Sequence, residues 1–186
     1  MTSFLTILMT LYLMLAIVYC GRRKPDYRHL RDTISELGET GAPDQRLVAY
    51  AVFLPAGLLA LLIAGLLYES SQAASALAAS IAAGYTGAAF FPCDPGSPLK
   101  GSAKQDMHNV AGALQYIGGG AALLSLAAQF GNIYNGFAIV VLGAAVGISV
   151  PPLSPVRGLI QRIAELCLFG GLFAVTIALR HKEMLP

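Results

Sequence analysis

The chain has 186 residues, of which 56% are hydrophobic and 12% are charged, and its net charge is +2 at neutral pH. Soluble domains average roughly 25% charged residues, so this composition excludes an ordinary soluble domain and indicates a lipid bilayer as the solvent. No basic tract is long enough for a nucleic-acid footprint, which excludes nucleic acid as a partner. The three cysteines are widely spaced without a CxxC pair, so they indicate neither a zinc site nor a disulfide framework.

The first apolar segment covers about residues 2–20, and we expect it to be retained as a membrane span. A cleaved signal peptide is disfavoured because no Lys or Arg precedes the apolar run and Tyr19 is too large for a cleavage site. A polar loop over residues 21–46 follows. Its middle, DYRHLRDTISEL, repeats apolar residues at spacings of three and four: Tyr27, Leu30, Ile34 and Leu37. This pattern predicts a short amphipathic helix on the membrane surface.

Five further apolar segments lie at about residues 47–68, 73–91, 106–129, 133–150 and 159–179. Pro55 lies inside the first of these five, where it should kink the helix and leave one backbone carbonyl without its donor. The next segment contains ASALAASIAAGYTGAA, whose small residues let helices approach closely in lipid. With the first segment, these predict an all-α, six-span transmembrane bundle that forms one domain over residues 1–186.

The positive charges predict an orientation for this bundle. With six spans, ten of the twelve Lys and Arg residues lie on one side, in the loop 21–46 and around the later polar connections. Only Arg180 and Lys182 lie on the other side. Because positive loops normally face the cytoplasm, we expect an inner (plasma) membrane protein with both termini on the non-cytoplasmic side.

Polar residues converge on the positive side. FFPCDPGSP, residues 90–98, follows the third span, and Asp94 there can cap a backbone amide in a rigid turn. The fourth span begins QDMHNVAGALQY, which places five residues on one face: Gln105, His108, Asn109, Gly112 and Tyr116. Gln115 lies close to that face. A polar stripe is costly against lipid, so we expect this face to turn inward.

Arg162 and Glu165 lie three residues apart in the sixth span, where they can pair with each other. Alternatively, Arg162 can hold a lipid phosphate or a carboxylate. The sequence therefore predicts a polar layer at the cytoplasmic leaflet. Its candidate catalytic residues are His108, Asp94 and Glu165, and its candidate substrate-binding residues are Arg162, Ser35, Glu36 and Asp106. Carboxylates can tune a histidine into a general base, although His108 can equally be a hydrogen-bonding strut.

Three stretches then suggest a family: ISELGETGAP (34–43), GAAFFPCDPGSP (87–98) and DMHNVAGAL (106–114). Over about residues 5–180 the chain resembles the bacterial and archaeal membrane family catalogued as domain of unknown function 998, and RGLIQRI (157–163) fits the start of that family's last span. The resemblance implies a six-span helical protein. It also implies that characteristic positions of the family are occupied by Ser35, Glu36, Gly38, Pro43, Pro92, Asp94, His108 and Arg162. It implies no activity, and the absence of Trp departs from the aromatic residues usual late in the last span.

Two hypotheses for the function follow. The first is a protein that binds membrane lipids or serves as an accessory subunit alongside other membrane-protein subunits. The alternative is a lipid hydrolase or acyl transferase with its site at the cytoplasmic leaflet. A transporter is a weaker hypothesis, because no internal repeat of two halves is evident. We expect no metal site and no cofactor, since a single intramembrane histidine cannot provide bis-histidine haem ligation within one chain.

Overall fold

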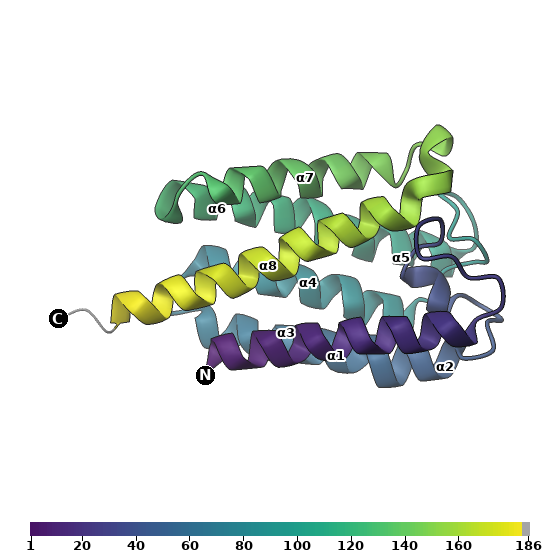
Figure 1. Cartoon of the computed structure of the whole chain (residues 1–186), viewed down its shortest axis with the longest axis horizontal. Coiled ribbons are helices and arrows are strands. Elements are labelled where there is room, and N and C mark those ends of the chain that lie inside the picture. The colour runs from purple at the N-terminus through teal and green to yellow at the C-terminus, as the bar shows by residue number, and fades with distance from the viewer. Residues whose placement is uncertain (184–186) are drawn as a thin grey trace.

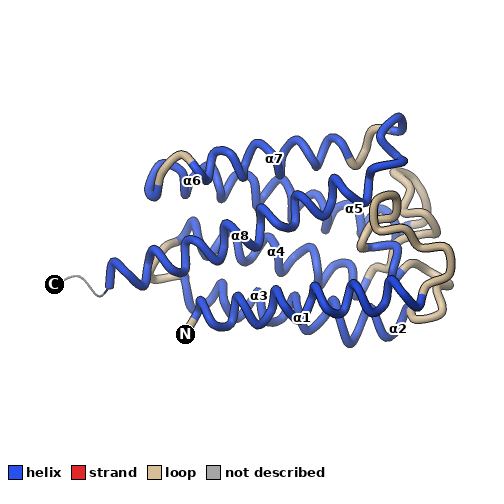
Figure 2. Tube along the Cα trace, viewed as in Figure 1, coloured by secondary structure: helices blue, strands red, loops and turns tan. Residues whose placement is uncertain are grey.

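The computed structural model describes residues 1–183, and it leaves out the side chains of residues 151, 152 and 183. The described residues form helices joined by loops, without strands (Figure 2). The long helical segments, in chain order, are α1 (Thr2–Arg23), α2 (Gln45–Leu47) with the π-helical turn η2 (Val48–Phe53) and α3 (Leu54–Leu67), α4 (Gln72–Phe90), α5 (Ala103–Ala113) with the π-helical turn η3 (Leu114–Gly118) and α6 (Gly119–Phe130), α7 (Ile133–Gly147), and α8 (Arg157–Glu183). Two short 3₁₀ turns lie in the connections: η1 (Ser35–Gly38) and η4 (Pro151–Val156).

The helices confirm the prediction of an all-α membrane bundle. Five continuous helices are long and apolar enough to cross a membrane, namely α1, α2–α3, α4, α5–α6 and the helix that contains α8. The apolar helix α7 has 15 residues and is shorter than the others. Helix α8 begins two residues before the expected segment and also includes Arg180–Lys182 of the polar tail RHKEMLP (residues 180–186), which follows the expected span. Residues 184–186 of that tail, and of the predicted domain, lie outside the described residues.

The helices run lengthwise, so the molecule has two distinct ends (Figure 1). The N-terminus, the end of α8 and the short α3–α4 and α6–α7 turns lie at one end, which we call the termini end. The three longer connections, residues 24–44, 91–102 and 148–156, lie at the opposite end, which we call the loop end. Segments that are far apart in the sequence therefore meet at the loop end.

The short surface helix expected in the 21–46 loop does not form. Residues 26–34 form successive turns and bends, and between α1 and α2 only η1 is helical. The Asp32 carboxylate accepts hydrogen bonds from the Arg28 amide at 2.7 Å and from the Arg31 side chain, which replaces helical bonding with a side-chain turn. The predicted apolar face is also split, because Ile34 is buried whereas Leu30 is 61% exposed.

Small residues bring α4 against its neighbours, as the sequence predicts. A Cβ added to Gly57 of α3 would lie 2.8 Å from the backbone nitrogen of Thr86 in α4. A Cβ added to Gly87 would lie 2.2 Å from Cβ of Ala111 in α5. The backbones of α3, α4 and α5 can approach this closely only because glycine occupies these positions.

Pro55 removes the donor of one backbone carbonyl, as the sequence predicts. It is the second residue of α3, two residues after the end of the π-helical turn η2, and it has no N–H to donate to the carbonyl of Ala51. The hydroxyl of Tyr12 in α1 donates to that carbonyl instead. The proline thus creates an acceptor that ties the first two membrane helices together.

Candidate functional site

A cavity of about 360 Å³ lies inside the loop end, among α4, α5, η3, α7 and α8. Residues 33–35 of the first connection cover part of it. This volume is within the range of small-molecule sites, which is about 300–1,000 Å³. The polar lining residues are Thr33, Ser35, Tyr85, Ser97, His108, Asn109, Gln115, Tyr116, Ser149, Gln161 and Glu165. The cavity therefore brings together residues of the first loop and of the fourth and sixth spans.

Glu165 of α8 is the acidic residue of this cavity. It is buried, and both carboxylate oxygens accept hydrogen bonds from neutral donors. Oε1 accepts from the Tyr116 hydroxyl at 2.7 Å and from Nε2 of Gln115 at 2.8 Å. Oε2 accepts from the Tyr85 hydroxyl at 3.0 Å and from the same Gln115 nitrogen at 3.1 Å. Within residues 1–183, no lysine, arginine or histidine forms an ion pair with Glu165.

Local features of two helices position these donors. The π-helical turn η3 contains the adjacent residues Gln115 and Tyr116, and both reach the same carboxylate. Such turns are rare within α-helices and often mark functional sites. On α4, Gly84 leaves the space that Gln115 occupies, because a Cβ there would lie 1.9 Å from Oε1 of Gln115. We call Glu165 with its donors Tyr85, Gln115 and Tyr116 the Glu165 cluster. This cluster depends on Gly84 as well as on its hydrogen-bonding residues.

His108 lines the same cavity from α5. Its Nδ1 lies 2.8 Å from the backbone carbonyl oxygen of Phe91, which can only accept a hydrogen bond. This contact assigns a proton to Nδ1, and in the neutral ring Nε2 then carries a lone pair. Among the described residues Nε2 has no hydrogen-bond partner, and no carboxylate contacts the ring. His108 is thus held at one nitrogen and leaves an acceptor at the other.

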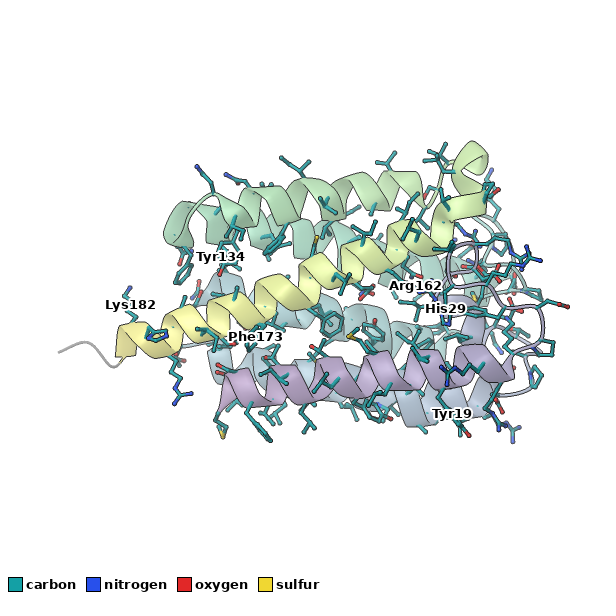
Figure 3. The ribbon with its side chains drawn as sticks, viewed as in Figure 1. Tyr19, His29, Tyr134, Arg162, Phe173 and Lys182 are labelled. Atoms are coloured by element: carbon teal, nitrogen blue, oxygen red, sulfur yellow. The ribbon has the colours of Figure 1, made fainter. Side chains whose placement is uncertain are left out.

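Arg162 does not pair with Glu165, although the two residues are three apart on α8. Its guanidinium turns to the first connection, where Figure 3 shows it beside His29. Nη1 donates to the carbonyls of His29 at 2.5 Å, Asp32 at 2.9 Å and Gly158 at 2.9 Å, and Nη2 donates to the Tyr27 hydroxyl at 2.6 Å. Of the two alternatives that the sequence leaves open for Arg162, the pair with Glu165 does not form among the described residues. Loop carbonyls use the planar donors that would otherwise hold an anion.

Two loop residues titrate outside their ordinary ranges because of this arrangement. Burial raises the pKa of Tyr27 to about 12, and the positive charge of Arg162 offsets part of that rise. Burial and the charge of Arg162 lower the pKa of His29. Neutral His29 can accept a hydrogen bond at Nδ1, which lies 3.0 Å from Nη2 of Arg162. Both shifts keep these side chains uncharged around the half-buried guanidinium.

Glu36 forms the second tie at the loop end and does not line the cavity. Its Oε1 accepts from the Thr33 amide at 2.9 Å, the Thr33 hydroxyl at 3.0 Å and Nη2 of Arg157 at 2.6 Å. Arg157 also donates to the carbonyls of Gly96 at 2.7 Å and Ser97 at 3.1 Å. This pair joins the first and second connections to the start of α8.

Asp94 lies in the turn before α5, where it caps a backbone amide as the sequence allows. Its carboxylate accepts from the Ser102 amide at 2.7 Å and the Ser102 hydroxyl at 2.8 Å. These hydrogen bonds lower the pKa of Asp94. The Asp94 amide in turn donates to Oε1 of Gln105 at 2.7 Å. Asp94 is therefore committed to the start of α5 and is absent from the cavity lining.

The seven candidate residues thus separate into two groups. Ser35, His108 and Glu165 line the cavity, whereas Asp94, Arg162, Glu36 and Asp106 do not. Asp106 is exposed in the first turn of α5. The buried Cys93 thiol beside these residues has its pKa raised to about 12 by burial.

Sequence reasoning did not identify Tyr85 and Gln161 as members of the site. Tyr85 is the only aromatic residue of α4 before Phe90, and this isolated ring in a run of small residues was the available signal. The Ile34 amide donates to Oε1 of Gln161 at 2.6 Å, which fixes the loop over the cavity. No sequence pattern indicates that pairing, because the two residues are 127 positions apart.

One comparison with known proteins gives a match. A family model described as "Protein of unknown function (DUF998)" matches residues 7–178. No curated protein and no solved structure matches the chain. The match covers the first membrane helix, the loop end and most of α8, so it includes every residue of the cavity.

Proposed function

The chain belongs to the DUF998 family of proteins of unknown function, and from this premise we propose that it binds one amphipathic, lipid-like molecule in the loop-end cavity. The observation that carries the proposal is the mixed character of that cavity. Polar groups from Glu165 and His108 share it with apolar wall residues such as Ile117, Ala145 and Ile148. An amphipathic ligand matches both kinds of surface, since its polar group and its chain each find a suitable wall.

The rim of the cavity supports access from lipid as well as from water. Leu99 lies in a loop-end connection and is 58% exposed, whereas Ile117 lies in η3 within a membrane helix and is 57% exposed. Both residues also line the cavity. A lipid-like molecule can therefore approach past Ile117 while its polar group stays near the loop end.

The lipid hydrolase or acyl transferase alternative has less support. A histidine base that activates a nucleophile needs a hydroxyl or thiol within hydrogen-bond reach, but among the described residues none bonds to Nε2 of His108, and Asp94 bonds to Ser102 instead. A binding protein needs neither. An accessory-subunit role is compatible with the proposal, because the cavity leaves the outer helix faces available to a partner.

We further propose that the loop end faces the cytoplasm at the plasma membrane. Ten of the twelve Lys and Arg residues belong to the loop-end side, and Arg180 and Lys182 belong to the termini side. The test uses single cysteines at Lys100→Cys and Arg180→Cys in a background without native cysteines. A membrane-impermeant maleimide applied to intact cells should label only the Arg180→Cys variant. Labelling of Lys100→Cys from outside overturns this orientation.

Two matched glycine variants test ligand binding. Gly112 lines the cavity, and a Cβ there meets nothing within 4 Å, so Gly112→Leu should fill part of the cavity. Gly143 of α7 is exposed, does not line the cavity and likewise has open space around its Cβ. Gly143→Leu is therefore the control for a leucine added to a membrane helix.

Each variant is purified, and the co-purified amphiphiles are identified by mass spectrometry of the intact complex. We expect the wild type and Gly143→Leu to retain one molecule per chain and Gly112→Leu to lose it. Equal retention by all three proteins contradicts the proposal. Turnover of the retained molecule, abolished by His108→Ala, favours the enzymatic alternative instead.

A further inference from the structure

The buried carboxylate of Glu165 has hydrogen bonds but no opposite charge. Its donors are two tyrosine hydroxyls and one amide, and all three are neutral. Neutral donors orient around a carboxylate, but they do not cancel its charge in a site removed from water. An ionisable side chain inside a membrane helix is costly and normally serves a ligand or ion. Among the described residues, Glu165 is thus a carboxyl group that lacks a counter-ion.

The cationic side chains of the loop end do not supply that counter-ion. Arg162 donates to the carbonyls of the first connection, and Arg157 pairs with Glu36 at 2.6 Å. Among the described residues that line the cavity there is no lysine or arginine. The cavity therefore presents a single negative charge, which repels an anionic head group and attracts a cation.

Three aromatic rings add a second feature that favours a cation. Phe53, Tyr85 and Tyr116 all line the cavity, and the ring centroids of Phe53 and Tyr85 are 5.8 Å apart. Ring faces attract ammonium groups electrostatically, and this attraction strengthens in a site shielded from water. A carboxylate beside several rings is a favourable environment for an organic ammonium ion, which combines charge with apolar surface.

His108, the second polar group considered for the cavity, can accept a hydrogen bond from a ligand. Nε2 of His108 has a lone pair in the neutral ring, and it has no partner among residues 1–183. An ammonium group brings N–H donors and no acceptor, so it complements both His108 and Glu165. The apolar wall of Ile117, Ala145 and Ile148 then accommodates an attached chain.

We infer that the ligand of this cavity is an alkylammonium amphiphile, whose positive head group pairs with Glu165 while its chain lies against the apolar wall. This inference rests on the proposed function, since it specifies the chemical class of the amphipathic ligand. It predicts discrimination by charge at constant chain length. Anionic and neutral amphiphiles of the same length should bind much more weakly.

The test follows thermal unfolding of the purified full chain in a neutral detergent. The chain has no tryptophan, but Cys20 and Cys93 are buried, so a thiol-reactive dye reports unfolding. Decylammonium, decanol and decanoate are titrated separately, with sodium chloride and potassium chloride as inorganic controls. We expect decylammonium to stabilise the wild type with an apparent affinity at least tenfold higher than that of decanol, and decanoate to give no stabilisation.

Glu165→Gln tests the carboxylate, and Glu69→Gln is its control because Glu69 is exposed at the termini end. The preference for decylammonium over decanol should fall at least tenfold in Glu165→Gln and remain in Glu69→Gln. The wild-type ligand series decides the question by itself if Glu165→Gln does not fold. Phe53→Leu then provides a second variant, because loss of one ring should weaken decylammonium more than decanol.

Failure of this inference differs from failure of the proposed function. Equal stabilisation by decylammonium and decanol, lost in Gly112→Leu, overturns the ammonium assignment and keeps an amphiphile site. Stabilisation by sodium or potassium alone overturns it in favour of an inorganic cation. No stabilisation by any amphiphile overturns both proposals.

Discussion

The side-chain hydrogen bonds at the two ends of the bundle differ in how far apart their partners lie in the sequence. At the loop end, side chains join residues that are far apart in the sequence: Arg162 with His29, Gln161 with Ile34, and Arg157 with Glu36. At the termini end of the described chain, side-chain hydrogen bonds connect residues closer in the sequence, such as Ser71 with Ala74, Asn132 with Asn135 and, across the α3–α4 turn, Ser75 with Ala64. The two turns there are short.

This difference shows what each end does. A membrane hairpin needs only a turn, and the termini end provides little more. The loop end contains additional tertiary structure, and residues 33–35 of that structure line the cavity. Its arginines are therefore elements of a cover over the cavity, and the charge available to a ligand is that of Glu165. Four predictions test this contrast, from the largest expected effect to the smallest.

Loss of Arg162 should affect the molecule most. Arg162→Leu leaves the carbonyls of His29 and Asp32 without their donor, so we expect a loss of about 3 kcal/mol in the free energy of unfolding. Arg180→Leu at the termini end should change it by less than about 0.5 kcal/mol, because exposed substitutions have small effects. Thermal unfolding measures both, and limited proteolysis of residues 24–44 localises the change. Equal effects at the two ends would contradict the contrast.

The second-largest effect is expected when the close packing of Gly84 against Gln115 is disturbed. In Gly84→Ala the new Cβ meets Oε1 of Gln115, so we expect a loss of about 2 kcal/mol and weaker binding of decylammonium. Gly136→Ala near the start of α7 is the matched control, since a Cβ there meets nothing within 4 Å. A Gly84→Ala protein with wild-type unfolding and binding would show that Gln115 can move without cost.

A smaller effect is expected for the tie between Glu36 and Arg157. We predict a coupling free energy of about 1 kcal/mol when Glu36→Gln and Arg157→Met are combined, because the two side chains contact each other at 2.6 Å. Unfolding of both single variants and the double variant measures this coupling. Strict additivity would mean that each residue acts only through its other partners, Thr33 and the carbonyls of Gly96 and Ser97.

The smallest expected effect is the loss of thermal stability of the protein at acidic pH. The hydrogen bonds from Ser102 lower the pKa of Asp94 in the folded protein. Asp94 therefore stabilises the fold at pH values above the ordinary carboxyl pKa, and that stabilisation is lost as the pH falls through the lowered value. We expect the melting temperature of the wild type to fall below about pH 4 and the curve of Asp94→Asn to be flatter there. Parallel curves for the two proteins would remove Asp94 from the loop-end structure.

Sequence patterns predicted local features better than long-range pairings. The inward face of the fourth span is confirmed, because His108, Gly112 and Tyr116 line the cavity. That face follows from helical periodicity and the cost of polar groups in lipid, both of which are local. Spacing along one helix allowed an Arg162–Glu165 pair as one alternative, but it does not reveal the loop carbonyls that compete for the guanidinium.

The amino-acid sequence by itself determined the helical membrane bundle, its concentration of positive charge in the loops and the small-residue contacts of α4, because hydrophobicity and residue size act on neighbours one or two turns away. Only the tertiary structure decided which charges neutralise each other. It turned Arg162 and Arg157 to the loops and left Glu165 with Tyr85, Gln115 and Tyr116. The reason is physical: electrostatic partners are selected by distance in space, and at the loop end those distances depend on how three separate connections fold over one cavity.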